Sequence, residues 1–180
     1  MKNNKNITKF AVILACLFCL TFSANAQKRR TTSRRAKTTT TQPTSTPMAN
    51  SEIKAGAEKV STQIKNVSKF IYVLGGVARG IEDIDKEAKT GKVSRDVLDK
   101  NAQFKKNVLQ SIRNLRAGLA ALEVEFRTNP SLKNYLFQIN GITDMSGTAE
   151  DQATAGQFTE SGKTLLLVIE KLSDTLAALP

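Results

Sequence analysis

The sequence predicts an all-α protein: an antiparallel helical bundle of three long helices plus one short helix, preceded by a disordered arm. Beyond residue 50, apolar residues recur at steps of three and four, which is the spacing of a buried helix face. No segment shows the sustained alternation of a strand, and the breaks between periodic segments are short. The predicted organisation is a signal peptide over residues 1–26, a basic arm over 27–49 and a helical bundle domain over 50–180.

The first predicted helix begins near Asn50 and ends near Gly91, where basic residues precede a glycine suited to a left-handed cap. Its apolar face follows the repeat of a helix packed along a partner helix. That face consists of Ile53, Ala57, Val60, Ile64, Val67, Ile71, Leu74, Ala78 and Ile81.

The second predicted helix runs from Ser94, whose hydroxyl can cap the first turn, to Arg127. Asn129 and Pro130 end it and begin a short third helix, because proline suits the first helical position after a capping Asn. The short helix is expected to end at Gly141. The apolar residues of these two helices are Val108, Ile112, Leu115, Leu119, Leu122 and Phe126, then Leu132, Tyr135, Leu136 and Ile139.

The last predicted helix begins near Thr148 and continues without interruption to Leu179. Its apolar and small residues again follow steps of three and four. They are Ala155, Phe158, Gly162, Leu165, Ile169, Leu172, Leu176 and Leu179. Gly162 is expected to let a neighbouring helix approach closely.

The first 26 residues have the order of a bacterial secretory signal peptide, with a Lys-containing segment, an apolar run and small residues before the cleavage site. Cleavage is expected between Ala26 and Gln27, which directs the chain to the periplasm or the outside of the cell. The apolar run is shorter than the roughly 20 residues of a bilayer span, so no transmembrane anchor is expected. A lipoprotein attached at Cys16 is the alternative.

Both cysteines, Cys16 and Cys19, lie in this leader, and the chain contains no histidine. The mature chain therefore lacks the ligands and nucleophiles of the usual zinc, haem and Cys–His or Ser–His sites. The sequence predicts no catalytic residue, no metal site and no cofactor. It favours a protein that is not an enzyme.

The positive charge of the chain is concentrated near its start. The formal net charge is +11, and three of the 27 basic residues lie in the leader. Six more lie in the Thr-rich arm, which has no acidic residue: Lys28, Arg29, Arg30, Arg34, Arg35 and Lys37. This leaves 18 basic and 16 acidic residues beyond position 50, so the predicted bundle is nearly neutral. The arm's composition is typical of disorder, because it offers almost nothing apolar to bury.

Two segments resemble a phosphate-binding loop and a calcium-binding loop, but the spacing of their residues does not match either motif. Gly162 precedes Lys163 and Thr164, but Gln157 stands where a phosphate-binding loop needs its first glycine. The acidic cluster after position 81 does not follow an EF-hand loop. Instead, helical spacing predicts ion pairs within the first helix, from Glu82 to Lys86 and from Asp85 to Lys89.

The sequence thus predicts an exported interaction or structural protein of the bacterial envelope, whose basic arm contacts anionic polymers or lipid headgroups. Nucleic acid is disfavoured as a partner because the arm has no aromatic residue to stack on bases. The helix faces leave a protein partner or self-association open. The alternative function is a carrier that holds a small apolar ligand between the helices near Gly76, Gly80 and Gly162.

Overall fold

The computed structural model of the chain describes residues 46–180, which belong to a compact unit that begins at Pro43. In this range the chain is helical except for short turns. Its elements are α2 (Thr46–Ala88), α3 (Arg95–Thr128), the short 3-10 helix η2 (Lys133–Tyr135), α4 (Leu136–Ile139), α5 (Ile142–Thr154) and α6 (Phe158–Ala178). None of the helices in residues 46–180 combines the length and the hydropathy that a membrane span requires.

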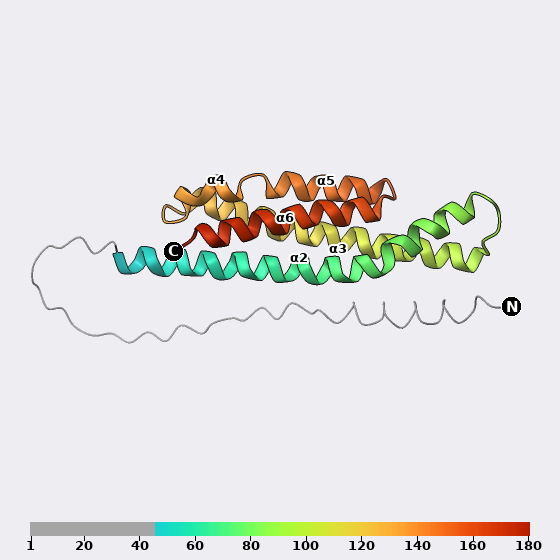
Figure 1. The fold of residues 1–180 in the computed structure, drawn as a ribbon, viewed down its shortest axis with the longest axis horizontal. Helices are drawn as coiled ribbons and strands as arrows, with labels where there is room; N and C mark the ends of the chain where they lie inside the picture. Colours follow the sequence, from blue (N-terminus) through green and yellow to red (C-terminus); the bar gives the residue numbers. More distant parts are fainter. Residues whose placement is uncertain (1–45) are drawn as a thin grey trace, which may run out of the picture. The chain divides into compact units, whose positions relative to one another are not determined.

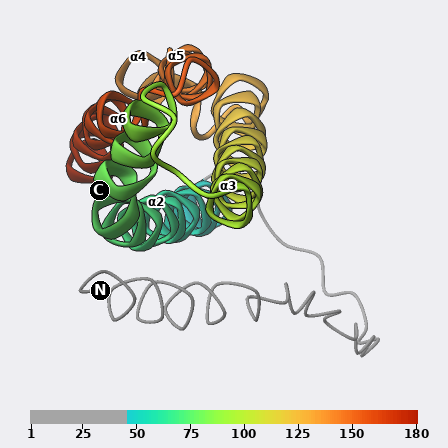
Figure 2. The same cartoon turned by 90° about the vertical axis from the view of Figure 1, so that its right-hand side faces the viewer.

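Four of these helices lie side by side as an antiparallel bundle. Viewed end-on, α2, α3, α5 and α6 occupy four corners, and each packs against the helices before and after it in this cycle (Figure 2). Successive helices run in opposite directions, and η2 with α4 forms the connection between α3 and α5 (Figure 1). The predicted all-α bundle is therefore confirmed.

The core runs along the centre of this bundle. Its fully buried side chains are the apolar residues that the helical spacing placed on the inner faces, together with residues of the α4–α5 segment. The largest are Phe126, Phe158, Ile81, Ile112, Leu119, Leu132, Ile139, Ile142, Leu165 and Leu172. Burying a side chain of this size contributes roughly 1.5–3 kcal/mol relative to its exposure. Packing of the four inner faces thus supplies most of the driving force for folding.

The first two helices follow the prediction closely, with two differences at their ends. α2 begins at Thr46, so the last residues assigned to the arm belong to the helix. Gly91 has φ +72°, as expected for a left-handed turn after α2. Ser94 occupies the N-cap position of α3 with an extended backbone, but its side chain makes no capping hydrogen bond, so the predicted hydroxyl cap is wrong.

The predicted break after α3 is confirmed, but the short helix does not begin at Pro130 as predicted: residues 130–132 form a turn, and η2 begins at Lys133. The Asn129 side-chain oxygen accepts a hydrogen bond from the Ser131 backbone N–H at 2.9 Å, which stabilises the turn at Pro130. Asn residues commonly form such turns because their short side chain reaches the backbone two residues on. The following short helical segment ends at Gly141, whose φ is +95°.

The prediction of one continuous last helix is wrong. The chain forms two antiparallel helices, α5 and α6, joined by a tight turn at Gly156. Gly156 has φ +81°, a left-handed conformation that costs other residues energy because of their Cβ atom. The turn is so short that the apolar spacing continues across it, and this continuity hid the break.

Replacing Gly156 with alanine is expected to destabilise the protein by about 1–2 kcal/mol, because an L residue pays that cost in the left-handed region. Gly75 is a matched control in the exposed face of α2, where an added Cβ meets no atom within 4 Å. Gly75→Ala is expected to stabilise by about 0.5–1 kcal/mol through helix propensity. Urea unfolding of both variants measures their free energies of unfolding. Equal changes in the two variants would contradict the left-handed turn at Gly156.

The alternative carrier function requires Gly76 to face the space between the helices, and it does not. Like Gly75, it is exposed, with no atom within 4 Å of an added Cβ. Gly162 does lie against α2 as predicted, since its added Cβ would be 3.4 Å from the Leu74 side chain. The tightest glycine contact is elsewhere: a Cβ on Gly56 would come within 2.7 Å of buried Leu132. Gly56 thus gives α2 room to pack on the segment after α3.

Candidate functional site

A surface hollow of about 500 Å³ lies at the end of the bundle where α5 turns into α6. One wall is α3 between Ala102 and Arg113, and the other is the segment from Ala153 to Phe158. Asp85 of α2 contributes the remaining charged group. The wall residues Lys105, Lys106 and Arg113 give the hollow an excess of positive charge.

Asp85 at the edge of the hollow is fully engaged by α3. The Lys105 ammonium lies 2.8 and 2.9 Å from its two carboxylate oxygens. Asn101, which is buried, donates a further hydrogen bond to Asp85 at 2.8 Å and one to the Ile81 carbonyl at 3.4 Å. The predicted ion pair from Asp85 to Lys89 is therefore wrong, because Asp85 joins α2 to α3 instead.

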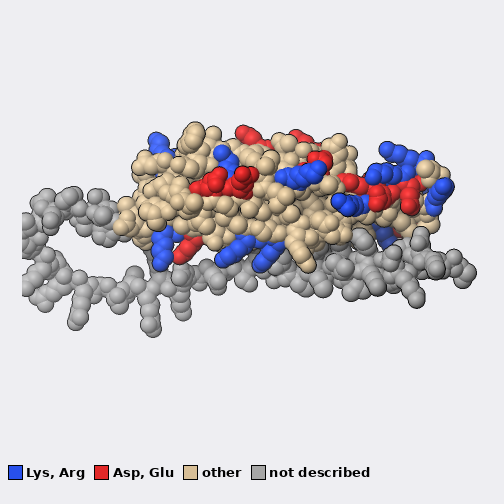
Figure 3. Space-filling model, viewed as in Figure 1, with Lys and Arg blue, Asp and Glu red and all other residues tan. Residues whose placement is uncertain are grey.

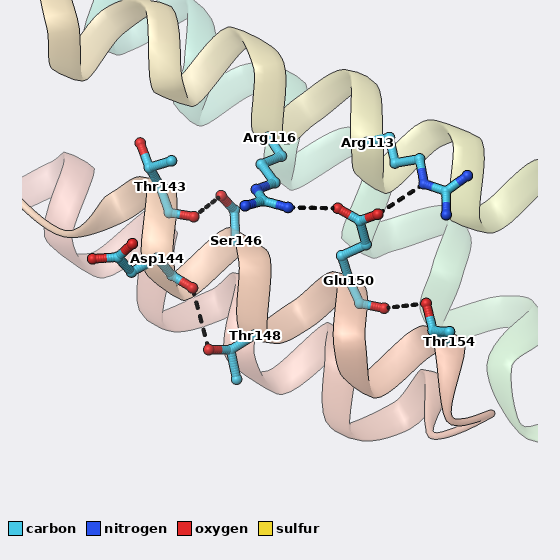
Figure 4. Close-up of polar contacts among 8 residues, drawn as sticks. All are labelled: Arg113, Arg116, Thr143, Asp144, Ser146, Thr148, Glu150 and Thr154. Atoms are coloured by element: carbon cyan, nitrogen blue, oxygen red, sulfur yellow. Dashed lines mark hydrogen bonds and ion pairs between the residues drawn. The ribbon is translucent and has the colours of Figure 1, made fainter.

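Two arginines of α3 hold a glutamate of α5 beside the hollow (Figure 4). Arg113 Nε donates to one oxygen of Glu150 at 2.7 Å, and Arg116 Nη1 donates to the other at 3.0 Å. These two hydrogen bonds and the arginine charges lower the pKa of Glu150 against the opposing effect of its partial burial. Gly147, one turn earlier on α5, lies beside the Arg116 guanidinium, which would be 3.4 Å from an added Cβ.

Glu123 is the only acidic residue in the range 46–180 that is buried, and it forms a polar cluster at the start of α5. Its side chain accepts hydrogen bonds from the backbone N–H groups of Gly141 and Thr143 at 3.2 and 3.1 Å, and from the Thr143 hydroxyl at 2.7 Å. Arg127 lies 3.3 Å away on the exposed side. Burial alone would raise the pKa of Glu123, but these hydrogen bonds and the Arg127 charge together bring it below its ordinary value.

Glu82 of α2 binds the first turn of α6, as Glu123 binds the first turn of α5. Its oxygens accept hydrogen bonds from the Thr159 backbone N–H at 2.7 Å and from the Thr159 hydroxyl at 3.1 Å. A carboxylate at this position satisfies a backbone donor that has no partner within the helix and suits the positive end of the helix dipole. The predicted pair from Glu82 to Lys86 is wrong, and Lys86 instead pairs with Asp83 at 3.3 Å.

These carboxylates are arranged for fastening helices rather than for proton transfer. A general acid needs a raised pKa near the working pH, whereas the pKa values of Glu123 and Glu150 are lowered. Their oxygens are occupied by donors from the neighbouring helix. Among residues 46–180, no three acidic side chains come together as a group that could hold a metal ion.

The residues predicted to carry function from the sequence lie outside the described range. These are the signal cleavage pair Ala26 and Gln27, the alternative lipid site Cys16, and the basic residues Lys28, Arg29, Arg30, Arg34, Arg35 and Lys37. The carrier site near Gly76, Gly80 and Gly162 gains no support: Gly76 faces outward, and Leu74 packs at Gly162.

Sequence reasoning missed the buried role of Glu123, although a signal for it was present. Glu123 lies three residues before Phe126 and directly after Leu122, on the apolar side of its helix. An acid on that side is buried and has to be paired.

Comparisons of the chain with protein-family models, with curated proteins and with solved structures find no match.

Proposed function

We propose that this chain is an exported, non-enzymatic interaction or structural protein of the bacterial cell envelope. In this proposal the helical bundle is held on a basic arm, and the arm contacts anionic polymers or lipid headgroups. The observation that carries it is the separation of charge along the chain. Six basic residues and no acid lie within residues 27–42, and the compact unit that follows in the sequence is almost neutral.

The polar clusters of the bundle support the proposal of a non-enzymatic structural or interaction module. Glu123 and Glu150 join α3 to α5, Glu82 joins α2 to α6, and Asp85 joins α2 to α3. Each of the four helices is thus fastened to a neighbour by a carboxylate. A unit of this kind suits a role in which the bundle keeps its shape while a partner or surface is bound.

The magnitude of the arm's attraction follows from its charge. A Lys or Arg near an anionic lipid surface contributes about 1 kcal/mol, so six contribute up to about 6 kcal/mol. Because even half of this value corresponds to roughly a hundredfold in affinity, the arm can dominate surface binding. The attraction is screened by salt, since the Debye length shortens to about 8 Å at physiological ionic strength.

The first test removes the arm. Binding of the mature chain, residues 27–180, to anionic vesicles and to cell-wall preparations is compared with that of a chain lacking residues 27–42. This deletion ends where the compact unit begins at Pro43, so the helices stay intact. Binding of the shortened chain is expected to fall at least about a hundredfold at low salt. Equal binding by the two chains at low salt would contradict the role of the arm.

A further inference from the structure

The outer faces of α2 and α6 combine exposed apolar side chains with rows of charge. Tyr72 of α2 is 86% exposed, and Leu166 and Leu167 of α6 are 52% and 53% exposed. Exposed lysines precede Tyr72 at helical spacing, and exposed acids follow the leucines at helical spacing. We call these residues the α2–α6 face: Lys65, Lys69, Tyr72, Leu166, Leu167, Glu170 and Asp174.

Two contacts give the register of these helices. Gly162 lies against Leu74, and Thr159 is bound by Glu82, so α2 and α6 run antiparallel as neighbours. With a rise of 1.5 Å per residue, Tyr72 lies about 3 Å and Leu166 about 6 Å from the Leu74–Gly162 level, on the same side of it. The tyrosine and the leucine are therefore nearly level along the bundle.

The same arithmetic places the charges opposite one another. From that level, Lys69 and Lys65 lie at about 8 and 14 Å, and Glu170 and Asp174 at about 12 and 18 Å. None of the four forms an ion pair with another residue of the range 46–180. One helix thus carries a basic row and its neighbour an acidic row at matching heights. Lys and Arg side chains project along the lower edge of the molecule in Figure 3, where α2 runs.

We infer that the α2–α6 face binds a second copy of this chain around a two-fold axis parallel to the bundle. Such an axis keeps the height of every residue and exchanges the two helices. It therefore sets Lys65 and Lys69 of one copy against Glu170 and Asp174 of the other, and Tyr72 against Leu166. A two-fold interface needs a self-complementary surface, and these two rows of opposite charge provide one.

The face is of the size found in weak protein interfaces. If the contact extends over the whole of α6, which has 21 residues and is about 30 Å long, two helices each about 10 Å wide present roughly 600 Å² per copy. The total is near the low end of stable protein interfaces, so a dissociation constant in the micromolar range is expected. The inference does not depend on the arm, because every residue involved lies in the bundle.

Charge exchange between two variants tests this interface. One variant of residues 27–180 carries Lys65→Glu and Lys69→Glu, and the other carries Glu170→Lys and Asp174→Lys. In the proposed dimer each variant repels its own copy, whereas a one-to-one mixture restores both attractive contacts. Sedimentation equilibrium is expected to find a concentration-dependent doubling of mass for the unmodified chain, at least tenfold weaker association of each variant alone, and recovery in the mixture.

Two substitutions of exposed apolar residues distinguish specific association through this face from nonspecific hydrophobic association. Leu166→Asp is expected to weaken the dimer at least tenfold, whereas Val124→Asp on α3, a residue of nearly the same exposure at 53%, leaves it unchanged. Circular dichroism checks that each variant is folded. The inference is overturned if the unmodified chain stays monomeric to several hundred micromolar, or if the folded charge variants associate as strongly alone as the unmodified chain does.

Discussion

Replacing Glu123 with alanine is expected to lower the free energy of unfolding by about 3 kcal/mol. The substitution leaves the partly buried donors of Gly141 and Thr143 without their acceptor, and a buried donor that loses its partner costs about 1–3 kcal/mol. The Glu123 side chain is only 8% exposed, so water cannot readily replace it. Urea denaturation of the variant and the unmodified chain measures this loss.

Glu125→Ala is the matched control, two residues away on the same helix. Its carboxylate pairs with Lys59, whose side chain is 55% exposed. A surface pair of this kind contributes about 0–1 kcal/mol. A loss at Glu125 as large as that at Glu123 would contradict the assignment of Glu123 as the buried link between α3 and α5.

Acid is expected to lower the free energy of unfolding, in part through the Glu123 carboxylate. Because its hydrogen bonds outweigh burial and lower the pKa of Glu123 in the folded state, the unfolded state binds more protons at mildly acidic pH. The stabilisation is therefore complete above the ordinary glutamate pKa of about 4.3 and is lost as the pH falls through the lower, folded value. In Glu123→Gln this part of the pH dependence should vanish, while the part from Glu150, which has the same sign, remains.

Replacing Phe126 with alanine is expected to cost about 3–5 kcal/mol, as is usual for a fully buried phenylalanine. Phe126 of α3 has no exposed surface and packs in the central core. Phe137 of α4 is the control, since its side chain is 88% exposed. Phe137→Ala should change the stability by no more than about 0.5 kcal/mol. Similar shifts in the urea midpoint for both variants would contradict the packing of the bundle.

These two phenylalanines show what helical spacing can predict. Phe126 continues the steps of three and four along α3, whereas Phe137 falls outside the apolar positions of its short helix. The inner faces of α2 and α3 and the turns at Gly91 and Gly141 could be predicted for the same reason. They depend on spacing and turn chemistry that are local in the sequence.

The features that could not be predicted depend on contacts between helices. Glu82 binds Thr159, which is 77 residues away, and Asp85 binds Lys105, so their partners are set by how α2 lies against α6 and α3. Local spacing offered Lys86 and Lys89 as partners instead. The α5–α6 turn was missed because the apolar spacing continues across Gly156, although the left-handed backbone of Gly156 and the non-helical backbone of Gln157 separate the two helices.

Removing charge without removing residues tests whether the basic arm brings the nearly neutral bundle to an anionic surface. One variant of residues 27–180 replaces Lys28, Arg29, Arg30, Arg34, Arg35 and Lys37 with glutamine. The control replaces six exposed lysines of the bundle instead: Lys54, Lys86, Lys89, Lys92, Lys100 and Lys133.

The measurement is co-sedimentation of these two variants and the unmodified chain with anionic vesicles at low and raised salt. We expect the arm variant to lose at least about a hundredfold in affinity at low salt, and the control, which carries the same net charge, to keep most of its binding. Equal losses in the two variants would show that net charge alone matters, and binding that survives in the arm variant would contradict this role of the arm.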